Sequence, residues 1–117
     1  MDNQPKINMT PLPEKTCSID KLITHPKLVA ATLAGNKTQQ RRNGVYGWPG
    51  ETFKLDDGVF VITKLYKQRL GDMSDADAKA EGYDGLDAYQ ALILRMHPNM
   101  QWQDDGEAWV HQFERQP

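Results

Sequence analysis

The chain has 117 residues, of which 38 % are apolar, and its net charge is −2, from 14 lysines and arginines against 16 aspartates and glutamates. This balance argues against sequence-independent binding to duplex nucleic acid, which depends on neutralising many phosphates, although it allows a local basic groove. No apolar run approaches the roughly 20 residues of a membrane span, so we expect one soluble, cytoplasmic domain with no membrane partner. Cys17 is the single cysteine, which excludes a disulfide within the chain.

The N-terminal part of the sequence is predicted to be a tail that leads into one domain. Residues 1–16 are polar, contain three prolines and show no apolar periodicity, so we expect a flexible tail there. The single domain is expected to cover residues 17–117. The apolar residues between positions 19 and 23 favour a short strand or extended segment at its start.

A helix is predicted next, because the sequence carries signals for both of its ends. Thr24 or His25 is suited to the N-cap, Pro26 to the first turn, and Gly35 to the position just past the C-terminus. The polar residues 37–42 are then expected to form a strand or extended segment.

The middle of the chain predicts a hairpin followed by a short helix. Residues 52–55 and 59–66 are rich in β-branched and aromatic side chains and are separated by Asp-Asp-Gly, which is typical of a β-hairpin. Ser74 and Asp77 have the spacing of a capping box, so a short helix is predicted over residues 75–81.

The C-terminal part predicts one more helix and a closing strand. Asp84 is the expected cap of a helix with an apolar stripe at helical spacing, and Pro98 ends it. Residues 107–115 alternate as a strand does. The total of five or six short, mostly antiparallel strands and two or three helices, without regular βαβ alternation, predicts an α+β fold with a small barrel or sheet.

Charged residues are sorted along the chain. Positions 37–42 and 64–69 hold basic residues without an acid among them, whereas positions 72–87 are strongly acidic. Such a domain is polarised, although a strand face and helix caps would give the same pattern.

Three motifs follow one another along the chain: Gly35-x-Lys37 with Arg42, Pro49-Gly50-Glu51-x-Phe53, and Ala80-Glu81-Gly82-Tyr83. Their order resembles the ASCH domain family, whose β-barrel is similar to that of RNA-binding PUA domains. The resemblance covers residues 19–115. The resemblance implies a small PUA-like barrel and an RNA-related ligand.

Within this family, the chain is similar to small bacterial enzymes that hydrolyse the exocyclic amide of N4-acetylcytidine. Their pattern, Gly-x-Lys-x-x-Thr-x-Arg with a glutamate on a helix, falls on Gly35, Lys37, Arg42 and Glu81. The threonine position is occupied by Gln40, which departs from the pattern because an amide cannot act as an activated nucleophile. The resemblance therefore implies that Lys37 and Glu81 are catalytic, and it leaves enzymatic activity open.

Each candidate residue also has a plain structural interpretation. Lys37 and Glu81 are suited to proton transfer or to holding a ligand. Their plain interpretation is a surface lysine on a strand and a solvated carboxylate at a helix end. Gln40 is suited to reading a base edge and Arg42 to binding phosphate. Arg41 is expected to point away from Arg42, towards solvent.

Four further residues are candidates for ligand binding. Thr38 is a poor substitute for the missing threonine, because adjacent strand residues point to opposite faces. Tyr46, Trp48 and Tyr83 are suited to stacking on a nucleobase or to packing within the domain.

We therefore expect a domain that recognises RNA or a modified nucleoside in a cleft near Lys37, Gln40, Arg42 and Glu81. The alternative is an amidohydrolase acting on N4-acetylcytidine or a related N-acylated cytidine, with Lys37 and Glu81 in proton transfer. A protein-interaction module is a third class that the negative net charge allows. The three histidines lack metal-ligand spacing, so no metal and no cofactor are expected.

Overall fold

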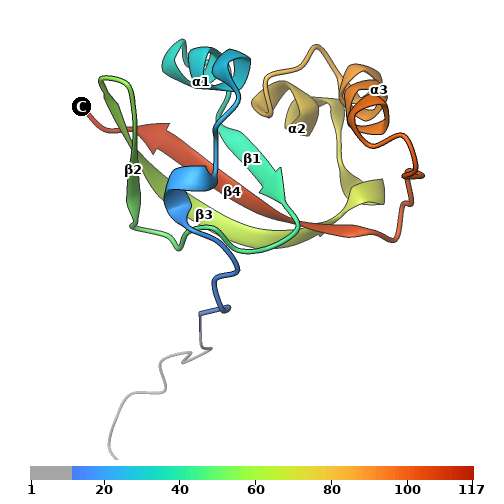
Figure 1. The fold of residues 1–117 in the computed structure, drawn as a ribbon, viewed down its shortest axis with the longest axis horizontal. Helices are drawn as coiled ribbons and strands as arrows, with labels where there is room; N and C mark the ends of the chain where they lie inside the picture. Colours follow the sequence, from blue (N-terminus) through green and yellow to red (C-terminus); the bar gives the residue numbers. More distant parts are fainter. Residues whose placement is uncertain (1–11) are drawn as a thin grey trace, which may run out of the picture.

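The computed structural model describes residues 12–117. Its strands form one curled sheet, and its α-helices lie along one side of that sheet (Figure 1). In chain order the elements are η1 (Ile19–Lys21), α1 (Pro26–Leu33), β1 (Gln39–Arg42), β2 (Thr52–Leu55), β3 (Gly58–Arg69), η2 (Leu70–Asp72), α2 (Asp75–Ala80), α3 (Leu86–Met96) and β4 (Glu107–Arg115). Within residues 12–117, no helix has both the length and the apolar character needed to cross a membrane.

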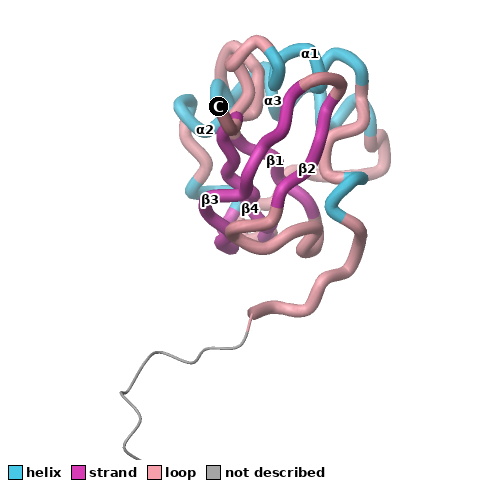
Figure 2. Tube along the Cα trace, turned by 90° about the vertical axis from the view of Figure 1, so that its left-hand side faces the viewer, coloured by secondary structure: helices cyan, strands magenta, loops and turns pink. Residues whose placement is uncertain are grey.

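The four strands of the described chain form one antiparallel sheet in the order β1-β4-β3-β2, which curls into a half-barrel (Figure 2). The long ladder between β3 and β4 shifts register between Ile62 and Lys64, so that Thr63 is left out of the register, although its hydroxyl donates to the carbonyl of Gln112. The predicted α+β fold and the hairpin of β2 and β3 are confirmed. The sheet has four strands in the described chain, in place of the expected five or six.

Register divides the sheet into an inner and an outer face, because cross-strand partners share a face and neighbours along a strand alternate. The inner face carries Gln40, Arg42, Phe60, Ile62, Leu65, Lys67, Trp109, His111 and Phe113. The outer face carries Gln39, Arg41, Lys64, Tyr66, Gln68, Val110, Gln112 and Glu114. These two faces meet different helices.

The main hydrophobic core lies on the inner face. Phe53, Phe60 and Phe113 pack with ring centroids 5.5 to 6.2 Å apart, and Leu22 and Ile23 close the cluster. Residues of α1 lie against it. A second cluster of Met73, Ala78 and Tyr89, with partly buried neighbours, holds α2 and α3 together beside the outer face. The segment between these two clusters is β1.

The helix signals in the sequence are largely confirmed. His25 caps α1, Ser74 and Asp77 form the capping box of α2, and Gly35 adopts φ 84° after α1. The predicted cap at Asp84 is wrong, because the N-cap of α3 is Gly85. Its Leu86 N–H donates instead to the Asp75 carboxylate of α2, at 2.9 Å.

The expected strand near residues 19–23 is also wrong, since η1 is a 3₁₀ helix. Leu22 and Ile23 are adjacent in sequence and both are buried, with 0 % and 3 % exposure. A strand would turn these neighbours to opposite sides, whereas a helical turn allows both to reach the same core.

The segment before η1 contacts the sheet end. Lys15 forms a parallel bridge with Val45, and its ammonium lies 2.7 Å from Glu51. The Trp48 indole N–H donates to the carbonyl of Pro13 at 2.8 Å. The expected tail, residues 1–16, otherwise falls mostly outside the described residues.

Candidate functional site

The ammonium of Lys37 is buried and fully hydrogen-bonded. It donates to the carbonyl of Gln39 at 2.7 Å, to the carbonyl of Glu81 at 2.9 Å and to Glu81 Oε1 at 3.2 Å. An ammonium has three N–H donors, so these contacts use all of them. Lys37 is 1 % exposed and Glu81 is 2 % exposed. Lys37 and Glu81, which the sequence placed near one cleft, are therefore in contact, and the pair is shielded from solvent.

Burial determines the protonation behaviour of Lys37. Desolvation lowers the pKa of its ammonium, and the charges of Arg41 and Arg42 lower it further, while the Glu81 carboxylate partly offsets these effects. The lysine therefore releases its proton more readily than a surface lysine does. A lowered pKa is the property that proton transfer requires of a lysine base.

Arg41 is the third member of the buried network. Its Nη1 donates to Glu81 Oε2 and to Gln39 Oε1, both at 2.9 Å. Its Nε and Nη2 donate to Gln68 Oε1 at 3.1 and 2.8 Å, and its Nη2 lies 3.5 Å from Asp77. Lys37 and Arg41 thus hold the two oxygens of one carboxylate.

The expectation that Arg41 points to solvent is wrong, because only 6 % of this residue is exposed. Arg41 does point away from Arg42, but its side of β1 is the one that α2 covers. A signal for this network was present in the sequence. Asp77 and Glu81 are four residues apart, so a helix places both carboxylates on one face, where they require a cationic partner.

The main chain around Lys37 is held by three elements. Lys37 N–H donates to the carbonyl of Ala31 in α1, and Thr38 N–H donates to that of Ala80 in α2, at 3.2 and 2.7 Å. The carbonyl of Thr38 accepts from Phe113 N–H of β4 at 3.0 Å. The entry to β1 is therefore fixed between α1, α2 and β4, while the Thr38 side chain is exposed.

Gly82 allows the chain after α2 to turn directly over Lys37. Gly82 has φ 105°, which L-residues rarely adopt, and a Cβ at this position would lie 3.6 Å from Lys37 Cβ. The next residue, Tyr83, packs edge-on against Tyr89, with ring centroids 5.3 Å apart. Burial and the charge of Glu81 raise the pKa of Tyr83, so this phenol lies close enough to Glu81 to feel its charge.

Gln40 and Arg42 lie on the inner face and do not join Lys37 and Glu81. Gln40 Nε2 donates to the carbonyl of Arg41 at 3.0 Å, whereas its buried Oε1 has no hydrogen-bond partner within residues 12–117. Arg42 donates to the carbonyl of Leu22 through Nε at 3.2 Å and through Nη2 at 2.7 Å. Arg42 therefore holds β1 against the segment after η1, whereas the Gln40 side chain bonds only within β1.

His111 was not expected to matter, yet it is fully buried beneath β1. Its Nε2 accepts from Tyr46 N–H at 3.0 Å, and its Nδ1 lies 3.2 Å from the carbonyl of Gln40. An amide N–H only donates and a carbonyl only accepts, so the ring is neutral with its proton on Nδ1. Burial lowers the pKa of His111, in agreement with this state.

The two other aromatic candidates lie away from the network. The ring of Tyr46 meets His111 edge-on, with centroids 6.0 Å apart, and Arg42 lies 5.2 Å above it. Trp48 is held by the N-terminal segment, and the Lys15 ammonium lies 4.6 Å from its ring centroid. Of the aromatic residues singled out from the sequence, only Tyr83 lies beside Glu81.

Arg41 connects the buried network to two side-chain amides on the outer face, those of Gln39 and Gln112. Arg41 holds Gln39 Oε1, so Gln39 presents its Nε2, which lies 3.5 Å from Gln112 Oε1. This distance is at the limit for a hydrogen bond, so the two amides hold each other weakly. Gln112 is half-buried. Gln39 is only 8 % exposed, so a donor and an acceptor lie side by side just beneath the surface of the outer face, with Gln112 as the more accessible of the two.

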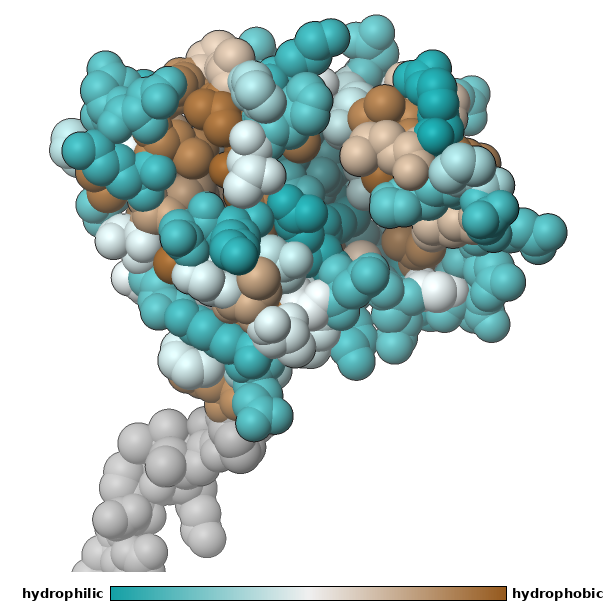
Figure 3. Space-filling view, viewed as in Figure 1, coloured by the Kyte–Doolittle hydropathy of each residue, from teal (hydrophilic) through white to brown (hydrophobic). Residues whose placement is uncertain are grey.

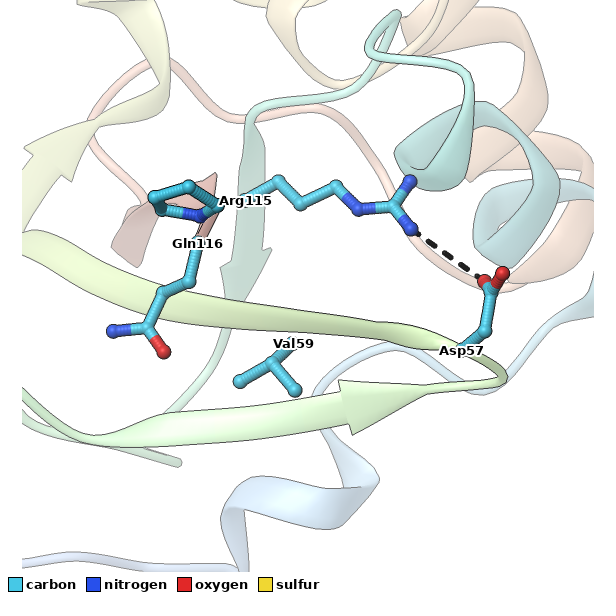
Figure 4. A pocket seen from close by; sticks show the side chains of 5 residues that line it. Asp57, Val59, Arg115 and Gln116 are labelled. Carbon is cyan, nitrogen blue, oxygen red and sulfur yellow. Dashed lines mark ion pairs between the residues drawn. The ribbon is translucent and has the colours of Figure 1, made fainter.

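The surface is hollowed between α1 and the α2–α3 pair, with hydrophilic residues in its depth and more hydrophobic residues on its right-hand rim (Figure 3). A separate pocket of about 550 Å³ lies at the far end of the sheet, lined by Asp57, Val59, Arg115 and Gln116 (Figure 4). Arg115 reaches across it to Asp57 at 3.5 Å. This pocket contains no member of the Lys37 network.

Comparison with known proteins shows the fold of the chain. No family model and no curated protein matches the sequence. The structure is similar to an ASCH domain from Lactobacillus crispatus JV V101, with a TM-score of 0.60 and 15 % identity, over 85 % of this chain and 79 % of that chain. It is also similar to a DUF984 protein from Enterococcus faecalis V583, with a TM-score of 0.59 and 17 % identity, over 77 % and 67 % of the two chains. The protein therefore has an ASCH-like α+β fold.

Proposed function

We propose that the protein recognises RNA or a modified nucleoside, and that the Gln39–Gln112 amide pair reads the edge of a base. The single observation that carries this proposal is the orientation of Gln39 by the buried chain from Lys37 through Glu81 to Arg41. Each link in the chain is fixed by charge and burial, so the side-chain amide of Gln39 points its Nε2 towards Gln112. The likeness to an ASCH domain supports the proposal at the level of the fold.

The chemistry of the amide pair fits a nucleobase. Each base edge carries donors and acceptors in one plane, and an amide donor beside an amide acceptor complements such an edge. Gln39 supplies the donor and Gln112 supplies the acceptor. Because the 3.5 Å contact between the two amides is weak, a base edge that pairs with both amides replaces little hydrogen bonding.

The proposal is tested by measuring the affinity of the full chain for cytidine, N4-acetylcytidine and labelled RNA octanucleotides. Gln112→Leu is expected to weaken binding by roughly 2- to 10-fold, because one hydrogen bond contributes about 0.5–1.5 kcal/mol. Gln103→Leu is the matched control, since Gln103 is an exposed glutamine in the loop before β4. Absence of binding by the parent chain, or equal losses in both variants, would overturn the proposal.

A second candidate function is amide hydrolysis on an N-acylated cytidine, which the contact between Lys37 and Glu81 favours. A lysine of lowered pKa beside a carboxylate is suited to proton transfer. Two observations speak against it: the ammonium has no free donor, and Gln40 lies on the opposite face of β1 from Arg41. Product formation from N4-acetylcytidine, lost in Lys37→Ala, would place hydrolysis above recognition.

A further inference from the structure

We propose that the outer face around Tyr66 and Lys64 binds the nucleotide whose base the amide pair reads, so that the ligand is a single strand of RNA. This inference rests on the function proposed above and deepens it. Neither residue was singled out as a site residue from the sequence. Tyr66 is the proposed stacking platform and Lys64 is the proposed phosphate contact.

The register of the sheet places both residues beside the amide pair. Lys64 lies directly opposite Gln112, and Gln112 lies directly opposite Gln39, so the three form a row across β3, β4 and β1. Tyr66 is two residues along β3 and shares the outer face. The rows on a strand face are about 7 Å apart, which is within reach of a bound nucleotide.

Tyr66 is available to a ligand in a way that the other aromatic residues near the network are not. It is half-buried, and its ring takes part in none of the aromatic pairs found among the described residues. By contrast, Tyr83 packs on Tyr89 in the helix cluster. A nucleobase that stacks on an aromatic ring must be unpaired and splayed, which selects a single strand over a duplex.

Lys64 supplies a positive charge that can pair with a phosphate, which RNA carries and a free nucleoside lacks. Its side chain is exposed and has no ion pair within residues 12–117. Glu114 lies two residues beyond Gln112 on the same face, so a phosphate is repelled from that side. The charges therefore place the phosphate of the ligand towards Lys64, across from Gln112.

The inner face offers a matched control with the same residue types. Lys67 is three residues from Lys64 on β3, but its ammonium lies 5.2 Å from the ring centroid of Trp109 and 3.8 Å from Glu107. This lysine and this aromatic residue are engaged with each other. Lys67→Gln removes the same charge from the same strand on the opposite face.

The experiment measures binding of cytidine, cytidine monophosphate and labelled single-stranded RNA octamers to the full chain across a range of salt concentrations. Tyr66→Leu is expected to weaken RNA binding about 5- to 100-fold, because stacking contributes roughly 1–3 kcal/mol per base. Tyr66→Phe is expected to retain most of the affinity. Lys64→Gln is expected to make the slope of log affinity against log salt shallower by about 0.7, whereas Lys67→Gln leaves it unchanged.

The outcomes separate this inference from the proposed function. RNA binding that Tyr66→Leu leaves intact, in a variant whose circular dichroism matches the parent, overturns the stacking platform and leaves recognition by the amide pair standing. Equal affinity for cytidine and the octamer overturns the RNA strand as ligand. Monophosphate binding as tight as octamer binding restricts the ligand to one nucleotide and contradicts the strand. A parent chain that binds none of the three probes overturns both proposals.

Discussion

The ammonium of Lys37 and the carboxylate of Glu81 lie 3.2 Å apart, with side chains that are 0 % and 2 % exposed. A buried ion pair is costly to desolvate, and removing one partner leaves the other charge uncompensated. Here one carboxylate compensates two cations, since Arg41 holds its second oxygen. Glu81 is therefore the central residue of the network.

Replacing Glu81 is expected to be far more destabilising than replacing a surface carboxylate. Glu81→Gln should lower the free energy of unfolding by about 3–5 kcal/mol, because Lys37 and Arg41 lose their counter-charge inside the protein. Urea denaturation measures the change. The control is Glu51→Gln, which breaks the partly exposed pair with Lys15 and should cost at most about 1 kcal/mol. Similar losses in the two variants would contradict the buried network.

Arg41 and Arg42 should respond differently to replacement by lysine. Arg41 uses three nitrogens on four side-chain partners, which a single ammonium cannot reproduce. We expect Arg41→Lys to cost about 2 kcal/mol or more, since several buried groups lose their donor. Arg42→Lys keeps one donor for the carbonyl of Leu22 and should cost less. Thermal unfolding of both variants measures this order, and a larger loss for Arg42→Lys would reverse our assignment of the two arginines.

His111 should make stability depend on pH. Its pKa is lowered from 6.5 in the folded chain, so below about pH 6.5 the unfolded chain binds more protons than the folded chain. Stability is therefore complete above pH 6.5 and falls as the pH drops towards the folded pKa. Protonation of Nε2 would also place an N–H against the N–H of Tyr46.

The test compares urea denaturation at pH 7.5 and pH 5.5 for the parent and for His111→Gln. The pKa values of the Glu51 and Asp77 carboxyls are lowered by their hydrogen-bond partners, which moves their titration further from the pH range compared here. We expect a smaller free energy of unfolding at pH 5.5 in the parent and a weaker dependence in the variant. An unchanged slope in His111→Gln would show that another group is responsible.

Hydrolysis of N4-acetylcytidine is expected to be weak or absent in the parent chain. Gln40 provides no nucleophile, and its side-chain Oε1 is buried on the inner face. Gln40→Thr is the informative variant, because it restores the residue type of the similar enzymes, and chromatography of the products measures turnover. If Gln40→Thr is active, β1 must rearrange to bring position 40 to the network. If neither chain is active while ligand binds, recognition stands alone.

The elements with local signals were predictable from the sequence. The hairpin, the capping box at Ser74 and the closing strand depend on turn residues, capping and alternation, all of which act over a few residues. The short 3₁₀ helix at residues 19–21 was missed because its cause is non-local. Leu22 and Ile23 both pack against strands that follow much later in the chain.

The site was predictable only in part, for a similar reason. The contact between Lys37 and Glu81 followed from the order of the motifs, yet which face of β1 meets α2 depends on how the sheet curls. Sequence therefore grouped Gln40 and Arg42 with Lys37, whereas the structure brings Arg41 and Gln39 to Glu81 instead. The position of Tyr66 and Lys64 near Gln112 was not predictable from the sequence either, because it depends on the register of β3 and β4.

Mapping of ligand contacts by ¹⁵N NMR tests the central claim, recognition by the outer face, most directly. The full chain is titrated with a single-stranded RNA octamer while backbone and side-chain amide shifts are followed. We expect the largest changes at the side-chain amides of Gln39 and Gln112 and at the backbone of Lys64 and Tyr66. Changes concentrated at the pocket beside Asp57 and Arg115, or no changes at saturating RNA, would contradict it.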